Sequence, residues 1–236
     1  MLLTGTIVQN IAAVRERIER AARRANRSPD TVRLVAVSKT VEPERIREAY
    51  AAGLREFGEN RVQEAAAKKP ILVDLDIRWH LVGHLQSNKA QKAAELFDEI
   101  QSVDSLALAE KLDRAVEKAG RRCLPVLLQV RMGGEPTKSG IEEAELLPLV
   151  RGIASLAHLA VQGLMSIPPF FDDAEQARPY FRRLRELAGE LASARIRGIS
   201  AQELSMGMSH DFEVAIEEGA TVVRIGTAIF GERPKG

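Results

Sequence analysis

Short apolar segments rich in β-branched residues recur along this chain, and a segment with helical periodicity follows each of them. Such runs are typical of strands that are buried on both faces of a parallel sheet. We predict strands at 32–38, 55–60, 77–83, 99–103, 124–130, 159–165, 203–206 and 221–225. Eight strands alternating with helices in 236 residues fit a (β/α)₈ TIM barrel, which typically takes about 250 residues.

The competing α/β architecture is an open, doubly wound sheet. That fold usually carries a glycine fingerprint after its first strand, and none follows the strand at 32–38. An amphipathic helix precedes that strand, with Val8, Ile11 and Ile18 on one face. No linker or low-complexity tract divides the chain. We therefore predict one domain over residues 1–236, a TIM barrel with an extra N-terminal helix.

Composition and charge exclude several classes of protein. The chain has 34 basic and 33 acidic residues, so no strong field favours nucleic acid or an anionic membrane surface. No apolar run is long enough to span a bilayer, and no signal-peptide pattern is visible. Cys123 is the only cysteine, which suits a reducing compartment. We expect a cytoplasmic monomer without nucleic-acid or membrane partners.

Lys39 ends the first predicted strand. Alternation along the strand places Lys39 on the same side as Val35 and Val37. A desolvated lysine favours the neutral amine, which can form a Schiff base with a carbonyl compound such as pyridoxal phosphate. The alternative is a lysine that reaches solvent where the strand ends, as most lysines do.

Polar and glycine residues gather where the other predicted strands end. In a TIM barrel the carboxyl ends of the strands form one rim, and that rim carries the functional residues. The residues at this rim are Lys39, Glu59, Asn60, Gly83, His84, Met165, Ser166, Ser205, Arg224, Gly226 and Thr227. Each could be a turn or cap residue alone, but their concentration predicts a site.

The loops after the seventh and eighth strands suit a phosphate. Gly226 and Thr227 open a short predicted helix, whose free N–H groups and dipole attract an anion. The segment 205–209 adds hydroxyl groups, and Gly207 permits close backbone approach. TIM barrels often bind phosphate with these two loops. The alternative is that Gly207 and Gly226 are only turn residues.

Arg224 lies in an apolar strand, and alternation turns it into the barrel mouth. A buried arginine needs an acceptor or an anion. The ring nitrogen of pyridoxal phosphate is one such acceptor; it would stay unprotonated beside the cation, which makes the ring a weaker electron sink. The alternative is an ion pair with Glu203 or Glu59.

Other chemistries find less support. Four histidines and one cysteine form no compact metal-ligand pattern, so we predict no metal site. No Gly-x-Ser-x-Gly nucleophile elbow occurs. His84 is a candidate for either backbone capping or acid–base work, and His210 is expected at the start of a helix. Met165, Met206 and Met208 are expected to pack around a pocket.

Blocks of sequence in chain order resemble successive signatures of the pyridoxal phosphate homeostasis proteins. These are VAVSKT (35–40), FGENRVQE (57–64), WHLVGHLQSNK (79–89), GLM (163–165), LSMGMSHDF (204–212) and RIGTAIFG (224–231). The resemblance implies a barrel of the alanine racemase N-terminal-domain type, without the second β-domain of the racemase. It also implies that pyridoxal 5′-phosphate (PLP) is the cofactor.

The resemblance also assigns roles by position. Lys39 would hold PLP as a Schiff base, and Arg224 would face the ring nitrogen. The phosphate would be bound by Ser205, Gly226 and Thr227, with Gly207 in the same loop, and the pocket would be lined by Asn60, Met165 and Ser166. The segment 135–140, which contains Lys138, matches a Glu-x-x-Lys-x-Gly pattern of the family. At Arg131 the chain departs from the asparagine of many members.

The implied function is control of the PLP supply and, through it, of amino-acid and keto-acid balance. PLP-dependent client enzymes are the implied partners, and no established reaction is implied. Racemisation needs an acid–base group opposite the lysine, yet Tyr50 and Tyr180 fall in predicted helices. One alternative is a PLP-dependent enzyme, such as an amino-acid racemase, that uses His84 or a cysteine instead. Another is a Schiff-base aldolase that binds a sugar phosphate without PLP.

Overall fold

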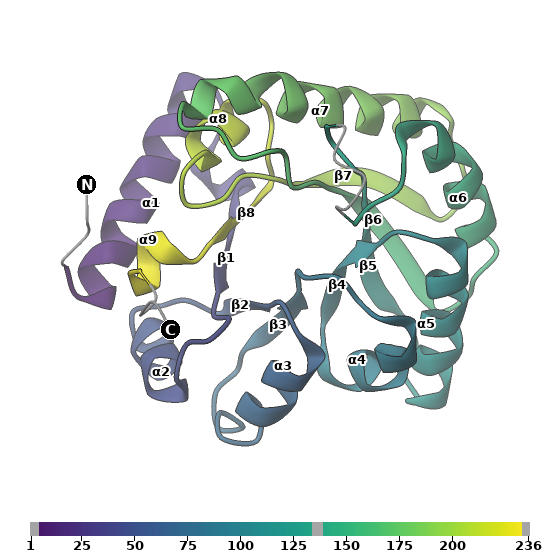
Figure 1. Cartoon of the computed structure of the whole chain (residues 1–236), viewed down its shortest axis with the longest axis horizontal. Coiled ribbons are helices and arrows are strands. Elements are labelled where there is room, and N and C mark those ends of the chain that lie inside the picture. The colour runs from purple at the N-terminus through teal and green to yellow at the C-terminus, as the bar shows by residue number, and fades with distance from the viewer. Residues whose placement is uncertain (1–4, 134–138, 233–236) are drawn as a thin grey trace.

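Parallel strands close into a barrel in the computed structural model, which describes residues 5–133 and 139–232 (Figure 1). The strands are β1 (Arg33–Val37), β2 (Glu56–Glu59), β3 (Arg78–Leu81), β4 (Glu99–Val103), β5 (Leu124–Gln129), β6 (Leu159–Met165), β7 (Ile199–Ser205) and β8 (Val222–Ile225). Each strand pairs with the next in the sequence, and β8 pairs with β1 to close the ring. The predicted TIM barrel is confirmed.

Helices surround the barrel and cover the outer faces of its strands (Figure 1). They are α1 (Ile7–Arg24), α2 (Pro43–Ala51), α3 (Val62–Lys68), α4 (Ala90–Leu96), α5 (Leu106–Lys118), α6 (Leu146–Ile153), α7 (Arg178–Ser193), α8 (Phe212–Glu217) and α9 (Thr227–Phe230). Short 3₁₀ turns occur at Pro29–Thr31, Ser87–Lys89, Glu143–Glu145 and Ala174–Ala177. Outward-facing strand residues such as Ala36 and Phe57 join the apolar core beneath these helices.

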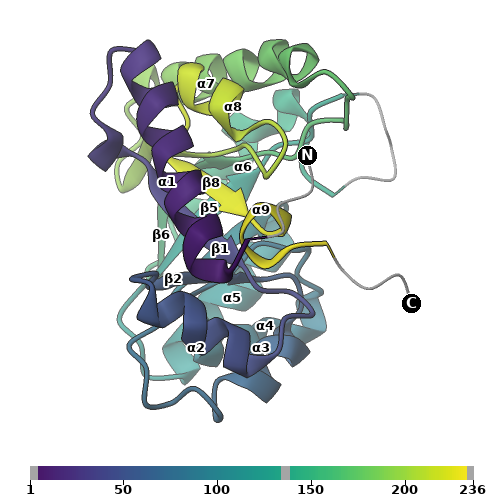
Figure 2. The ribbon, with the colours of Figure 1, turned by 90° about the vertical axis from the view of Figure 1, so that its left-hand side faces the viewer.

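The predicted extra N-terminal helix is confirmed as α1. The Thr6 side chain accepts a hydrogen bond from the Gln9 N–H, and the Gln9 side chain accepts one from the Thr6 N–H, so a capping box starts the helix. Figure 2 shows α1 lying along α8 and α9. The buried Asn10 amide donates to the carbonyl of Ile229 at 2.9 Å. The helix α1 therefore supports α9, the helix that follows β8.

The seventh strand is longer than the sequence pattern predicts. We expected it at 203–206, whereas β7 begins at Ile199 and ends at Ser205. Its first residues are only partly buried, and Ser200 and Gln202 interrupt the apolar pattern. These early residues belong to the strand because they pair with β6, where Val161 lies opposite Ile199. Burial does not define them.

Charged side chains fill the barrel interior at the amino ends of the strands, where most TIM barrels pack branched apolar residues. Arg33 lies 2.5 Å from Glu203 and 3.3 Å from Glu99. His80 lies between Glu56 and Glu99, at 2.9 and 3.3 Å. Burial alone would raise the pKa of Glu99, but hydrogen bonding to His80 and the charges of His80 and Arg33 lower it to about 2. This cluster closes one end of the barrel.

Candidate functional site

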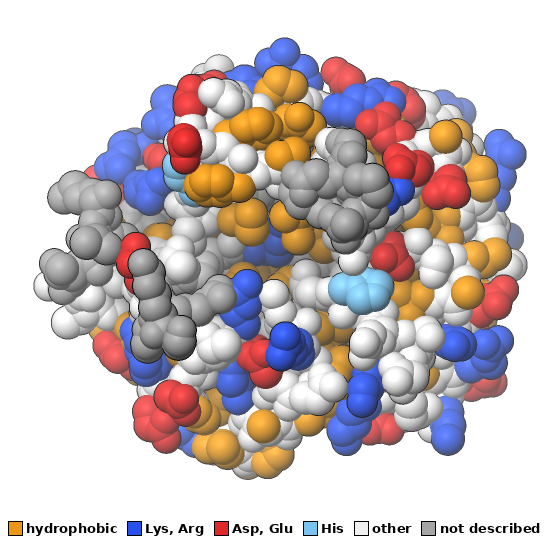
Figure 3. All heavy atoms as spheres, viewed as in Figure 1, with side chains coloured by type: hydrophobic (Ala, Val, Ile, Leu, Met, Phe, Trp, Pro, Cys, Tyr) orange, Lys and Arg blue, Asp and Glu red, His pale blue; other side chains and the backbone are white. Residues whose placement is uncertain are grey.

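A cavity of about 540 Å³ opens at the carboxyl ends of the strands, within the usual size range of small-molecule sites. The space-filling view shows a hollow at the barrel centre, with basic side chains at its bottom (Figure 3). The cavity is lined by Val37, Lys39, Asn60, Val82, Gly83, His84, Gln129, Ser139, Ile167, Phe170, Met208, Ser209, His210, Arg224, Gly226 and Thr227. The part of the predicted rim that lines this pocket is Lys39, Asn60, Gly83, His84, Arg224, Gly226 and Thr227.

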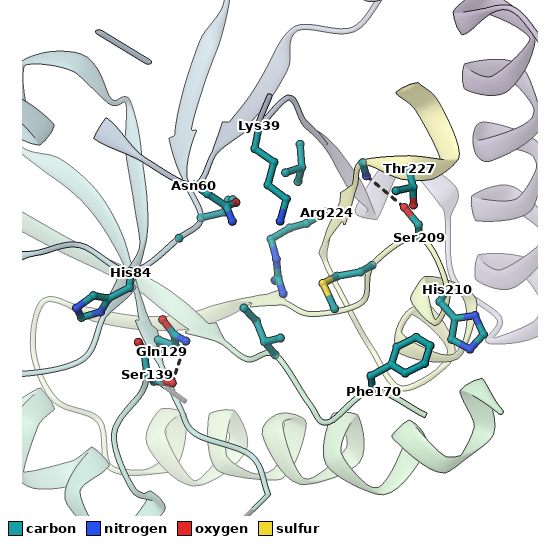
Figure 4. A pocket seen from close by; sticks show the side chains of 16 residues that line it. Lys39, Asn60, His84, Gln129, Ser139, Phe170, Ser209, His210, Arg224 and Thr227 are labelled. Atoms are coloured by element: carbon teal, nitrogen blue, oxygen red, sulfur yellow. Dashed lines mark hydrogen bonds between the residues drawn. The ribbon is translucent and has the colours of Figure 1, made fainter. Parts of the chain in front are cut away.

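Lys39 enters this pocket from the turn that follows β1. Val37 and Lys39 both line the cavity, as alternation along the strand predicts. Lys39 is half-buried, and its side chain points toward Arg224 in the close view (Figure 4). The lysine is therefore held at the mouth of the barrel, where a bound molecule would meet its amine.

Arg224 from β8 forms part of the pocket floor and is 3% exposed. Its Nη1 donates to the Ser205 hydroxyl at 2.7 Å, and its Nη2 donates to the carbonyl of Ser166 at 2.8 Å. Burial lowers the pKa of Arg224 to about 10, against the opposing charge of Asp211. At neutral pH the floor therefore still carries a positive charge.

The alternative of an ion pair between Arg224 and Glu203 or Glu59 is wrong. Glu203 lies 2.5 Å from Arg33, in the charged cluster at the far end of the barrel. Glu59 faces outward from β2 and lies 2.8 Å from Lys68. The Arg224 guanidinium is instead hydrogen-bonded to neutral oxygen atoms.

Hydroxyl and backbone N–H groups gather at the start of α9, and we call the group formed by Ser209, Gly226, Thr227 and Ala228 the Ser209–α9 cradle, or anion cradle. The hydroxyl of Ser209 accepts hydrogen bonds from the N–H groups of Gly226 and Ala228, both at 3.2 Å (Figure 4). The first N–H groups of a helix have no partner within the helix, so they are available to an anion or a hydroxyl. Thr227 lines the pocket beside them. This donor set suits a phosphate group.

Gly207 shapes the loop that delivers Ser209. Its φ of +90° is one that side chains rarely adopt, and a Cβ there would lie 2.6 Å from the Cβ of Ala215. The pattern of the segment 205–209 predicts hydroxyls near the phosphate, and the family resemblance implies that Ser205 is one of its ligands. Ser209, two residues after this glycine, is the serine of the segment that lines the pocket. The glycine at position 207 was the feature of the sequence that could have indicated a turn directing Ser209 to the pocket.

The other predicted site residues lie below the pocket. Ser205 is fully buried, and its hydroxyl donates to Oε1 of Gln101 at 2.6 Å while accepting from Arg224. Met165 and Ser166 are fully buried at the end of β6. Within the described residues, Met165, Ser166, Ser205 and Gly207 are not part of the cavity lining. Lys39, Asn60, Arg224, Gly226 and Thr227 do line it.

The pocket lining also includes His84, His210 and Phe170 at its mouth. The family resemblance assigns no cofactor contact to these three residues. His84 is largely exposed, with Nδ1 at 3.6 Å from Asp104. His210 precedes α8, and its ring lies 5.4 Å from that of the exposed Phe170. In the close view His84 lies on one side of Arg224, and His210 and Phe170 lie on the other (Figure 4).

The rim after β5 is only partly described. Arg131 forms an ion pair with Glu142. Gln129 lines the pocket and donates to the carbonyl of Ser139 at 3.0 Å. Lys138 and the preceding residues of the segment 135–140 lie outside the described residues. Within the described part, no cluster of three or more His, Cys, Asp or Glu side chains could hold a metal ion, and no helix is long and apolar enough to cross a membrane.

The fold and the pocket at its carboxyl rim can be compared with known families, and the description alanine racemase, N-terminal domain, matches residues 9–234 of this chain. Two curated relatives, from Aquifex aeolicus and Pseudomonas aeruginosa, are each 47% identical, over 95% and 98% of this chain and 97% and 98% of their own lengths. Both carry the name pyridoxal phosphate homeostasis protein. The chain belongs to this family.

A solved structure of a relative agrees with this assignment. The structure of PipY from Synechococcus elongatus PCC7942 with PLP bound is 44% identical in sequence to this chain. It superposes with a TM-score of 0.84 over 96% of this chain and all of PipY. The resemblance identified from sequence blocks therefore extends to the fold of the whole barrel.

Proposed function

We propose that this protein binds PLP in the pocket of the barrel and acts in PLP homeostasis as a carrier or regulator, without catalysing a reaction of its own. The observation that carries the proposal is the convergence of Lys39, Arg224 and the Ser209–α9 cradle on one cavity. An amine, a cation and an anion cradle match the aldehyde, the ring nitrogen and the phosphate of PLP. The relatives that carry the homeostasis name support the same function.

Each group has a distinct task in this proposal. The Lys39 amine adds to the aldehyde carbon, water leaves, and a C=N bond replaces the C=O bond without any oxidation or reduction. The N–H groups at the start of α9, together with Ser209 and Thr227, hold the phosphate. Asn60 lines the wall beside Lys39.

Arg224 favours holding PLP over using it as a strong catalyst. Bound PLP supplies an electron sink, and that sink is strongest when the ring nitrogen is protonated. The pKa of Arg224, about 10, keeps the guanidinium charged at neutral pH, so it donates to the nitrogen and disfavours a proton there. The site therefore suits reversible storage of the cofactor.

The alternative function is a PLP-dependent enzyme such as an amino-acid racemase. It is favoured by the position of His84 and His210 at the pocket, where either ring could exchange a proton. Tyr50 and Tyr180 are not part of the described lining: the Tyr50 hydroxyl accepts from the Asp76 N–H, and the Tyr180 ring stacks on Phe171. A racemase would therefore depend on a histidine.

The proposal includes the setting in which the protein acts. Residues 1–236 would serve as one PLP-binding domain and as a monomer in the cytoplasm. Client enzymes that take up PLP would be its partners, with no role for nucleic acid or membranes. The nearly equal numbers of basic and acidic residues support the absence of nucleic-acid and membrane partners.

The deciding experiment mixes purified protein with PLP and records its visible spectrum. We expect a yellow complex and, after borohydride reduction, a stable PLP label on the peptide that contains Lys39. Lys39→Ala should lose both signals, whereas Lys92→Ala, at an ion pair on the surface of α4, should keep them. A wild-type protein that stays colourless and unlabelled would overturn the proposal.

The same complex separates the carrier from the enzyme. The yellow protein is incubated with individual L- and D-amino acids, and the products are analysed by chiral chromatography. We expect no turnover beyond that of free PLP. Racemisation or decarboxylation that disappears in His84→Ala would favour the enzymatic alternative.

A further inference from the structure

A buried ion pair lies directly behind the turn that carries Lys39, outside the barrel wall. Glu59 at the end of β2 is fully buried, and the Lys68 side chain at the end of α3 is 10% exposed. The Nζ atom of Lys68 lies 2.8 Å from Oε1 of Glu59. Neither residue belongs to the lining of the proposed PLP pocket.

Both members of the pair bind the residue before Lys39. Lys68 Nζ donates to the carbonyl oxygen of Ser38 at 2.7 Å, and the Ser38 hydroxyl donates to Oε1 of Glu59 at 2.7 Å. The N–H of Ser38 donates to the carbonyl of Gly58 at 2.9 Å. Ser38 is thus held through its N–H, its carbonyl and its side chain.

The residue after Lys39 is held from the same helix. The N–H of Thr40 donates to Oε2 of Glu64 at 2.9 Å, and Glu64 also lies 3.8 Å from Lys68 Nζ. Thr40 has φ +61°, a strained conformation for a β-branched residue, in a turn closed by a 3.0 Å hydrogen bond from Val41 N–H to Ser38 O. The bond to Glu64 stabilises this conformation.

Stability alone does not account for the buried pair. Removing two charges from water offsets most of their attraction, so apolar residues of similar volume would serve a core about as well. Directional bonds to a neighbouring backbone do something apolar residues cannot, because they fix its position. Misplacing a reacting group by about 1 Å can cost roughly 100-fold in rate.

We propose that Glu59, Lys68 and Glu64 are positioning residues, which clamp the peptide units on both sides of Lys39 so that its amine meets the aldehyde of PLP. This inference rests on the proposed function and deepens it. The three residues act on the covalent step, in which the amine adds to the aldehyde and water leaves. They do not contribute to the hold on the phosphate or the ring.

The test compares two ligands on Lys68→Met, which removes the amine but keeps an apolar stem. PLP reports covalent attachment, through its visible absorbance and the borohydride-fixed label. Pyridoxine 5′-phosphate has an alcohol in place of the aldehyde and reports only non-covalent binding, measured by calorimetry. We expect attachment of PLP to weaken and slow by roughly tenfold, with the affinity for pyridoxine 5′-phosphate unchanged.

Lys69→Met is the matched control, because Lys69 follows in the chain and donates instead to the carbonyl of Leu96, away from the Lys39 turn. It should attach PLP like the wild type. Glu64→Gln keeps an acceptor for the Thr40 N–H and should also be normal, whereas Glu64→Ala should lose attachment selectively. The Glu64 variants decide the matter if Lys68→Met does not fold.

Two results would overturn the inference while leaving the proposed function intact. One is normal attachment of PLP in both Lys68→Met and Glu64→Ala. The other is an equal loss of affinity for both ligands, which indicates general damage to the pocket. The attachment of PLP to the wild-type protein is measured first, in the same assay. A wild-type protein that never attaches PLP would overturn the proposed function itself.

Discussion

The Ser205 hydroxyl lies beneath Arg224 and accepts a 2.7 Å hydrogen bond from its guanidinium. The same hydroxyl donates to Gln101, whose amide donates to Glu99 at 2.8 Å. A continuous series of hydrogen bonds therefore joins the pocket floor to the charged cluster at the opposite end of the barrel. Ser205 supports the cation and does not line the cavity, whereas Ser209 does.

The two serines should therefore differ when they are changed. Ser209→Ala removes a hydroxyl from the phosphate cradle, so the affinity for pyridoxine 5′-phosphate should fall by about tenfold. Pyridoxal, which has no phosphate, should bind as it does to the wild type. Calorimetry with both ligands measures the difference, and equal losses for both would contradict the cradle.

Ser205→Ala should instead destabilise the protein. It removes one buried hydrogen-bond partner from Gln101 and one from Arg224, at a cost of about 1–3 kcal/mol. Binding of pyridoxal should weaken together with that of pyridoxine 5′-phosphate, since both ligands share the ring over Arg224. Urea unfolding and the same calorimetry test this. Selective loss of the phosphate ligand would show that Ser205 contacts the phosphate.

Gly83→Ala should disturb Asn60 and weaken binding. A Cβ on Gly83 would lie 2.3 Å from the carbonyl oxygen of Asn60, so the backbone of the pocket wall must move. The matched control is Gly189→Ala in α7, where a Cβ would meet nothing within 4 Å. Alanine is the better helix former there and should add up to about 1 kcal/mol of stability. Thermal unfolding and PLP titration of both variants provide the comparison.

Acid should unfold the protein partly through Glu99. Its pKa of about 2 in the folded state lies below the ordinary value of 4.5, so its contribution is fully present above pH 4.5. That contribution, about 3 kcal/mol, is lost as the pH falls from 4.5 through 2. Urea unfolding between pH 7 and pH 3 should show a flatter curve for Glu99→Gln than for the wild type. Parallel curves would contradict this assignment.

Asn10→Leu should loosen the contact between α1 and α9. The variant loses the buried 2.9 Å bond to the carbonyl of Ile229, which should cost about 1–2 kcal/mol. Because α9 provides the anion cradle, the affinity for pyridoxine 5′-phosphate should fall several-fold as well. Arg20→Ala, which breaks an exposed pair with Glu16, should change stability by less than about 0.5 kcal/mol. An unchanged affinity for pyridoxine 5′-phosphate in Asn10→Leu would show that the contact of α1 with α9 does not support the anion cradle.

Much of the fold could be predicted from local patterns. The apolar runs and helical periodicity placed the barrel strands, and β4 and β6 begin and end where the pattern predicted. Only β7 was clearly misjudged, because its early residues are polar and are defined by pairing with β6. Alternation along the predicted strand at 32–38 also predicted which side Lys39 faces, although β1 ends at Val37 and Lys39 lies in the turn that follows it.

The amino-acid sequence by itself determined the alternation of strands and helices, the lysine at the first strand end and the signatures of the family. Only the tertiary structure decided which polar residues meet. Ser205 lies beside Gln101, 104 residues away in the chain, while the turn at Gly207 carries Ser209 to α9. Glu59 faces Lys68 behind the turn that holds Lys39. Closure of the barrel brings Ser205 to Gln101, and the packing of helices and loops against the strands makes the other contacts, so no local pattern encodes which side chains meet.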